Sequence, residues 1–295
     1  METKTAVKLL VLLALVSLLV SPTFLSAHGD KRPMKKGILL VAFGSTIPEA
    51  QVSFENIEQS VKESLPGVPV YWSYTSRIII KKMAKEGKHL ATPAEALAKM
   101  MRENFTHVVV QSLHTVPGAE FHGMLKNVHK FGGMDKGIKK VLVGYPLLAT
   151  SEDVQRVAEA IIKVIPRERK KKEGVVLMGH GTHHPANVYY AALAYHLQKL
   201  DPNVFVGTVE GWPEIDDIEA DLKKRRIKRV YLMPFMSVAG DHARNDMAGP
   251  EPDSWKSILE QEGIQCVPVL KGTAEYQEFV DIWVDHLRTA LEHFE

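Results

Sequence analysis

The sequence predicts an α/β protein built from two similar halves, each with a parallel sheet flanked by helices. Continuous apolar runs rich in Val, Ile and Leu alternate with segments of helical spacing. This alternation is typical of strands that are buried on both faces of a parallel sheet. The same plan occurs twice along the chain. With 295 residues, the chain is long enough to form two cores of ordinary size.

Four strands and two helices are expected in the first half. The expected strands are residues 38–43, 68–74, 107–112 and 139–144. One helix is expected from Pro48 to about residue 65. A second begins at Thr92, because Thr92, Pro93 and Glu95 place a capping residue, a proline and a glutamate where a helix start requires them.

The second half repeats this plan. Residues 37–45 align with residues 174–182, and residues 108–118 align in the same order with residues 230–240. Two ordered matches favour a duplicated domain. We therefore expect a first domain at 36–148 and a second at 149–295, with Ser151 capping the helix that follows the boundary and a final helix over residues 273–294.

The first 27 residues are typical of a signal peptide. Lys4 and Lys8 precede an apolar run at 9–20, and small residues follow as far as Ala27. This run is too short to cross a bilayer comfortably but suits a secretory h-region. Cleavage near Ala27 would give a periplasmic protein with no stable membrane span, and an uncleaved anchor is the alternative. Cys266 is the single cysteine, so no internal disulfide can form.

The charge of the chain excludes one class of partner. The formal net charge is only +2, so no strong positive field points to a nucleic acid. We expect a small-molecule ligand and a homo-oligomer.

Three side chains that can bind metal follow expected strands of the second half. His180 and Glu210 come directly after two apolar runs, and His242 lies in the loop after a third. The carboxyl ends of parallel strands meet at one edge of a sheet, which is where ligands bind in open α/β folds. Two imidazoles and a carboxylate form a ligand set that suits Co, Fe, Ni or Zn.

Several motifs resemble those of one enzyme family. They are Met178-Gly179-His180-Gly181-Thr182, Gly207-Thr208-Val209-Glu210-Gly211-Trp212-Pro213, Val238-Ala239-Gly240-Asp241-His242-Ala243, Asn245-Asp246-Met247-Ala248-Gly249 and Asp253-Ser254-Trp255. The first half adds Ala42-Phe43-Gly44-Ser45-Thr46, Tyr74-Thr75-Ser76-Arg77 and Gln111-Ser112-Leu113-His114-Thr115. From about residue 36 onward, the chain resembles the anaerobic sirohydrochlorin cobaltochelatases. The resemblance implies the bilobal class II chelatase fold, with the substrate in a cleft between the halves.

The resemblance also implies roles for the three candidate ligands. His180, Glu210 and His242 would bind the metal, and His180 would act as general base. The implied reaction inserts Co²⁺ into sirohydrochlorin with release of two protons. Glu210 would hold the cation and pass protons outward. Fe²⁺ and Ni²⁺ remain alternatives, because the order of metal affinities does not select cobalt.

The carboxylate rim of sirohydrochlorin needs hydrogen-bond donors and cations. Candidates are the segment Gly44-Ser45-Thr46, the hydroxyl of Ser112, the guanidinium of Arg77 and the ring of His114.

Two other functions fit parts of the pattern. An exported haem- or metal-binding carrier derived from a chelatase would share these ligands. A zinc hydrolase would use a similar set, but the sequence lacks its His-Glu-x-x-His signature.

The first half lacks the ligands of the second. Phe43 stands at the position of His180, and Glu120 at that of His242. His122 follows in the loop after Gly118, with Met124 nearby. Since His and Met both ligate haem iron, His122 is a candidate ligand for a second tetrapyrrole, such as haem between subunits.

Overall fold

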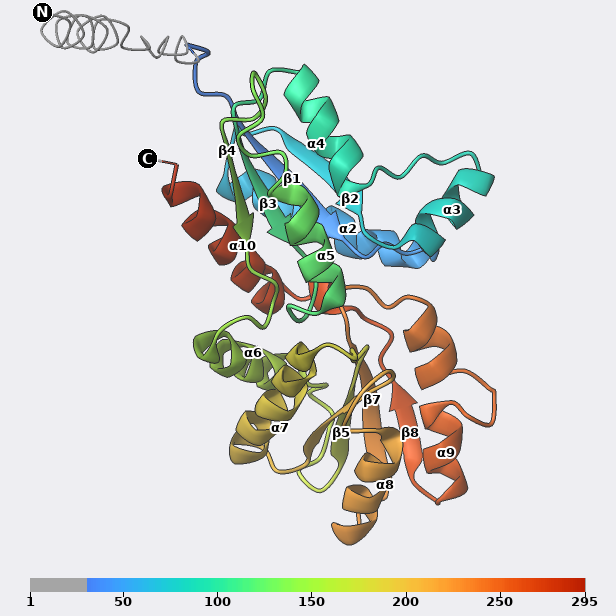
Figure 1. Cartoon of the computed structure of the whole chain (residues 1–295). Helices are drawn as coiled ribbons and strands as arrows, with labels where there is room; N and C mark the ends of the chain where they lie inside the picture. The colour runs from blue at the N-terminus through green and yellow to red at the C-terminus, as the bar shows by residue number, and fades with distance from the viewer. Residues whose placement is uncertain (1–30, 295) are drawn as a thin grey trace, which may run out of the picture. The chain divides into compact units, whose positions relative to one another are not determined.

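The structure is a computed structural model that describes residues 31–294. The expected signal peptide lies outside these residues. Each half contains a four-stranded parallel sheet, with the orders β2-β1-β3-β4 and β6-β5-β7-β8 (Figure 1). Within the described range, no helix is long and apolar enough to cross a membrane.

The elements alternate as the sequence predicts. In the first half they are β1 (Lys36–Ala42), α2 (Gln51–Ser64), β2 (Val70–Tyr74), α3 (Arg77–Lys85), α4 (Pro93–Arg102), β3 (His107–Ser112), α5 (Ala119–Val128) and β4 (Lys140–Gly144). In the second half they are α6 (Ser151–Val164), β5 (Gly174–Gly179), α7 (Val188–Leu200), β6 (Val204–Thr208), α8 (Ile215–Lys224), β7 (Arg229–Phe235), α9 (Trp255–Gln261), β8 (Gln265–Pro268) and α10 (Gln277–Glu292). Short 3-10 helices span Pro48–Ala50, Pro185–Asn187 and Thr273–Glu275, and a π-helix spans Ala243–Met247.

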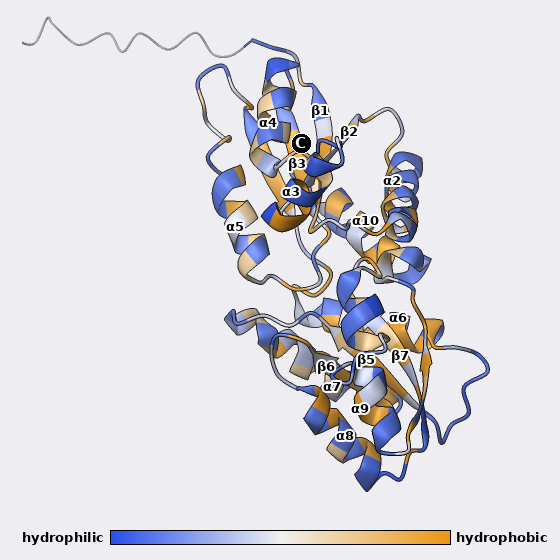
Figure 2. Cartoon of the chain, turned by 90° about the vertical axis from the view of Figure 1, so that its right-hand side faces the viewer, coloured by the Kyte–Doolittle hydropathy of each residue, from blue (hydrophilic) through white to orange (hydrophobic). Residues whose placement is uncertain are grey.

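The duplication is confirmed by strand order and register. The last residues of the central strands, Ala42 of β1 and Gly179 of β5, pair with Tyr74 of β2 and Thr208 of β6. Both central strands are buried because helices cover both faces of each sheet. In Figure 2, surface helices such as α4 and α8 carry hydrophilic and hydrophobic segments, as expected for helices that pack one face on a core.

Two helices in the first half were not expected. α3 begins after Ser76, whose side chain accepts a hydrogen bond from the Ile79 amide at 3.3 Å. α5 begins after Gly118, which offers no side-chain cap, so its start has no sequence signal. The placement of His122 in a loop is therefore wrong, because His122 lies on α5.

Helix α6, the first helix of the second half, is capped by Thr150. The expectation that Ser151 caps this helix is wrong by one residue. The Thr150 hydroxyl accepts from the Asp153 amide at 3.1 Å, and the Asp153 carboxylate accepts from the Thr150 amide at 2.9 Å. Reciprocal bonds of this kind require the carboxylate at the third helical position, and Asp153 occupies that position relative to Thr150.

The last helix departs from the expected boundary at residue 148/149. α10 follows the second half in sequence but packs on β3 and β4 of the first sheet and on α2, where Arg288 donates to the Ser64 hydroxyl at 3.0 Å. One hydrophobic core also joins Ile38 of β1, Val175 of β5 and Trp283 of α10. The chain from Met34 onward accordingly forms one compact unit rather than two separable ones.

Candidate active site

Three strand ends bring the predicted metal ligands together. His180 directly follows β5, Glu210 follows β6 by two residues, and His242 lies in the segment after β7. His180 Nδ1 lies 3.8 Å from Glu210 Oε2, and the rings of His180 and His242 have centroids 4.7 Å apart. The backbone holds the first two residues side by side, since the Glu210 amide donates to the His180 carbonyl at 2.8 Å.

Each histidine has one ring nitrogen engaged with the protein. His180 Nδ1 donates to the Gly181 carbonyl at 3.1 Å, because a carbonyl oxygen can only accept. His242 Nδ1 bonds to Asp246, one helical turn further along. Partners of this kind fix the tautomer and leave Nε2 with a lone pair for a metal ion or a proton.

The three side chains are accessible but do not yet enclose an ion. The side chains of His180, Glu210 and His242 are 34%, 51% and 33% exposed, so a cation can reach them from solvent. Among the residues that the structure describes, no three His, Cys, Asp or Glu side chains are already arranged to hold a metal. Glu210 approaches the Nδ1 side of His180, whereas a ligating imidazole would offer Nε2. A cation bound here would therefore draw the carboxylate to a new position.

The Asn187 side chain forms hydrogen bonds with both loops that carry His180 and Glu210. Its Oδ1 accepts from the Thr182 amide at 3.1 Å, and its Nδ2 donates to the Trp212 carbonyl at 2.7 Å. A Cβ at Gly211 would lie 2.4 Å from Asn187 Oδ1, so glycine is required for this close approach.

Sequence reasoning missed both supporting residues of the site. The spacing of four residues between His242 and Asp246 is a signal that could have found Asp246. Asn187 offered no such signal, because its partners belong to two separate loops.

Contacts between the halves surround the ligands. Phe43, the first-half equivalent of His180, has its ring centroid 6.1 Å from that of His180. Ser45 Oγ lies 3.5 Å from the position of a Cβ on Gly240, just before His242. The ligands therefore lie where the strand ends of the two sheets meet.

The residues predicted to contact the substrate carboxylates differ in how exposed they are. Ser45 is only 6% exposed, and its hydroxyl accepts from the Ile47 amide at 3.1 Å. Gly44 has a φ of +106°, which favours glycine at this strand end, and Thr46 is partly exposed. Arg77 is exposed at the start of α3 and forms no salt bridge with any described residue.

Ser112 and His114 bond to each other instead of presenting free donors. Ser112 Oγ lies 2.8 Å from His114 Nδ1, and Thr75 Oγ1 lies 3.2 Å from His114 Nε2. Burial lowers the pKa of His114 to about 4, because desolvation disfavours the charged imidazolium. This neutral ring links the loops after β2 and β3.

His122 lies at a second contact between the halves. Its ring stacks on that of His184 with centroids 4.6 Å apart, and its Nδ1 donates to the Gly118 carbonyl at 3.0 Å. Met124, only 3% exposed, packs in the core of the first half. Met124 therefore does not accompany His122 at the surface, since residues two positions apart on a helix face different directions.

Comparison with solved structures identifies the fold class. SirB from Bacillus subtilis with Fe³⁺ has a TM-score of 0.58 at 16% identity, covering 88% of this chain and 98% of that one. The sirohydrochlorin chelatase SirB from Bacillus subtilis subspecies spizizenii in complex with cobalt has a TM-score of 0.56 at 15% identity, covering 88% and 97%. Together with the two parallel sheets, these likenesses show the class II chelatase fold.

Sequence comparison then gives the family. Residues 36–292 match the model of the cobalt chelatase family CbiK. Sirohydrochlorin cobaltochelatase CbiKC of Nitratidesulfovibrio vulgaris (strain Hildenborough) is 47% identical over 87% of this chain and 91% of its own length. The sirohydrochlorin cobaltochelatase of Salmonella typhimurium (strain LT2) is 34% identical over 88% of this chain and 97% of its own length. The chain belongs to the cobalt chelatase family.

Proposed function

We propose that this protein is a sirohydrochlorin cobaltochelatase, which inserts Co²⁺ into sirohydrochlorin and releases two protons. The observation that carries the proposal is the grouping of His180, Glu210 and His242 at three neighbouring strand ends of a chain in the cobalt chelatase family. The relative at 47% identity has this activity in its name.

His180 is the proposed general base. Its Nδ1 donates to the Gly181 carbonyl, so Nε2 is the atom that can accept a proton from a pyrrole nitrogen. Glu210 is half exposed and lies beside the same ring, which suits transfer of protons from the site to solvent. Two pyrrole protons must leave as the cation enters, and this pair provides a path for them.

His242 and Glu210 are the proposed partners of the cation before insertion. Asp246 fixes the His242 ring and raises its basicity as a ligand. His180 completes the predicted set of ligands. Because two imidazoles and one carboxylate also suit Fe²⁺ and Ni²⁺, the choice of Co²⁺ is part of the proposal.

Phe43 is the proposed contact for the face of the macrocycle. This residue is 36% exposed and lies next to His180, so the apolar face of the macrocycle can pack on it. Arg77, which has no ion pair among residues 31–294, supplies a cation for a rim carboxylate, and Gly44, Ser45 and Thr46 supply strand-end backbone.

The experiment is a direct assay. Purified protein lacking residues 1–27 is mixed with sirohydrochlorin and Co²⁺, and the absorbance of the macrocycle is followed. A cobaltochelatase gives many products per protein molecule, whereas the carrier that shares these ligands stops at one. Parallel assays with Fe²⁺ and Ni²⁺ test the metal, and a rate no faster than the uncatalysed reaction refutes the proposal.

Export to the periplasm is proposed from the leader. The family match begins at residue 36, so residues 1–27 precede the matched region. We expect a mature chain shortened by about 27 residues, as the small residues before the predicted cleavage site indicate. Mass spectrometry of the chain from a periplasmic extract checks this, and a mature protein that retains residues 9–20 supports a membrane anchor instead.

Haem binding at His122 is a separate proposal. The Nδ1 bond to Gly118 leaves Nε2 of a solvent-exposed ring available to iron. Protein mixed with haem should show a Soret band that the His122→Ala variant loses, and identical spectra would end this proposal.

A further inference from the structure

The crossover between the halves, residues 145–150, lies along the loop that carries His114, one of the residues that the sequence predicts at the substrate site. Leu147 and Leu148 are fully buried, and their amides donate to the carbonyls of His114 and Thr115 at 3.0 and 2.8 Å. These carbonyls belong to the loop that follows β3. The position of the crossover therefore determines the position of this loop.

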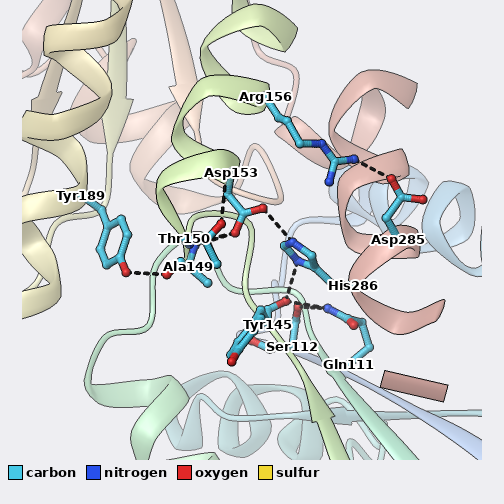
Figure 3. Close-up of polar contacts among 10 residues, drawn as sticks. All are labelled: Gln111, Ser112, Tyr145, Ala149, Thr150, Asp153, Arg156, Tyr189, Asp285 and His286. Carbon is cyan, nitrogen blue, oxygen red and sulfur yellow. Dashed lines mark hydrogen bonds and ion pairs between the residues drawn. The ribbon is translucent and has the colours of Figure 1, made fainter. Parts of the chain in front are cut away.

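His286, on the last helix, forms hydrogen bonds at both ends of the crossover. His286 Nδ1 donates to the Tyr145 carbonyl at 3.2 Å, and His286 Nε2 lies 2.9 Å from Asp153 Oδ1 (Figure 3). The other carboxylate oxygen of Asp153 accepts from the amides of Thr150 and Ala149 at 2.9 and 3.2 Å. The start and the end of the crossover are thus joined through one buried pair, whose side chains are 10% and 4% exposed.

The hydrogen bonds continue from the crossover into the site. The Tyr145 carbonyl also accepts from Gln111 Nε2 at 2.8 Å, and the same nitrogen donates to the Ser112 carbonyl at 2.8 Å (Figure 3). Ser112 in turn bonds to His114. A continuous series of bonds therefore runs from His286 to the loop with two predicted rim contacts.

The Asp153 carboxylate is held in its charged form. Burial raises its pKa, but hydrogen bonds and the charge of His286, with those from Thr150, outweigh burial and place the pKa below its usual range. A buried ion pair adds little to stability compared with apolar packing of the same volume. What this pair adds is orientation, because its two side chains together form three hydrogen bonds to the backbone of the crossover, at Tyr145, Ala149 and Thr150.

We propose that His286 and Asp153 are positioning residues that hold the Ser112–His114 loop in the arrangement that tetrapyrrole binding requires. This inference rests on the proposed chelatase function. Within the described part of the chain, neither residue has a hydrogen bond or ion pair to His180, Glu210 or His242. Loss of the pair should therefore weaken binding of the macrocycle and leave binding of the cation unchanged.

The two bonds of His286 can be removed separately. In His286→Gln, the amide nitrogen can replace Nε2 toward Asp153, but the bond to the Tyr145 carbonyl is lost. In His286→Asn, the amide nitrogen can replace Nδ1 toward Tyr145, and Asp153 loses its partner. Asp285→Asn is the matched control, because Asp285 is the next residue on α10 and its 2.5 Å ion pair with Arg156 joins the same two helices (Figure 3).

We expect His286→Gln to raise the KM for sirohydrochlorin about tenfold, the scale of one lost hydrogen bond with a charged donor, while kcat and the Kd for Co²⁺ stay within about twofold. Asp285→Asn should keep all three parental values. Sirohydrochlorin fluorescence quenching measures the same affinity without turnover, and thermal unfolding confirms that each variant is folded at the assay temperature. If His286→Gln is unfolded there, His286→Asn takes its place.

A parental KM in the folded His286 variant overturns the inference. An equal rise in KM for Asp285→Asn also overturns it, because the effect would then come from attachment of α10 in general. Failure of the proposed function gives a different result, in which the parent protein itself does not chelate. The quenching titrations then still compare the variants.

Discussion

The first strand of each half ends at an equivalent position, where the first half carries Phe43 and the second half carries His180. The two sheets have the same strand order and register, yet the three proposed metal ligands all belong to the second half. Positions equivalent to His242 and His114 hold Glu120 and Met236. The two halves thus share a backbone plan but differ in chemistry. The groups proposed to bind the cation and accept protons lie in the second half, and an aromatic ring with a neutral, half-buried histidine lies in the first.

The largest expected effect comes from the proposed base. His180→Ala should lower kcat by roughly 10²-fold or more, the usual scale for a positioned acid–base group. The parental dependence of kcat on pH should also be lost. A variant that keeps the parental pH profile would show that another group receives the pyrrole protons.

The next largest effects are expected for His242, a proposed metal ligand, and for Asp246, which orients it. His242→Ala should raise the Kd for Co²⁺ strongly and slow insertion at limiting Co²⁺, because one nitrogen ligand is lost. Asp246→Asn should raise the same Kd by about 10- to 100-fold, the scale for groups that orient a ligating histidine. Isothermal titration with Co²⁺ measures both. Parental affinity in His242→Ala would remove His242 from the site.

Asn187 tests whether the two ligand loops act together. Asn187→Asp keeps the acceptor for the Thr182 amide and loses the donor to the Trp212 carbonyl, whereas Asn187→Ala loses both. Each neutral hydrogen bond contributes about 1 kcal/mol, so we expect roughly fivefold weaker Co²⁺ binding for Asp and more for Ala. Equal affinities in all three proteins would show that the loops hold their positions without this residue.

A smaller effect is expected for Phe43, the proposed contact for the macrocycle in the first half. Phe43→Ala should raise the KM for sirohydrochlorin by about 2- to 10-fold, as for loss of one aromatic contact. The Kd for Co²⁺ should not change. A fall in Co²⁺ affinity equal to that of His242→Ala would contradict the division between the halves.

The last expected effect concerns stability in acid rather than catalysis at neutral pH. Folding lowers the pKa of His114 from 6.5 to about 4, so the unfolded chain binds the proton more readily. This contribution to stability is complete above pH 6.5 and falls as the pH drops towards 4, by at most about 3.5 kcal/mol at 1.4 kcal/mol per pKa unit. His114→Met introduces the residue of the second half. Its melting temperature should depend less on pH in this window, and an unchanged slope would assign the acid sensitivity to other groups.

Local signals predicted much of the fold. Apolar runs gave the strands within one or two residues, and Thr92 capped α4 as expected. The joint position of His180, Glu210 and His242 also followed from the sequence, because parallel strands end at one edge of a sheet. The α5 helix was missed since Gly118 gives no cap signal, and His122 was placed in a loop for that reason.

The sequence by itself determined the two repeated α/β halves, the strand ends that carry the ligands and the family resemblance, because these depend on residues close together in the chain. Only the tertiary structure decided where α10 packs, how Asn187 joins two loops and how His286 meets Asp153. The last two residues are 133 positions apart. No local pattern encodes such contacts, since they arise when buried groups find hydrogen-bond partners during packing.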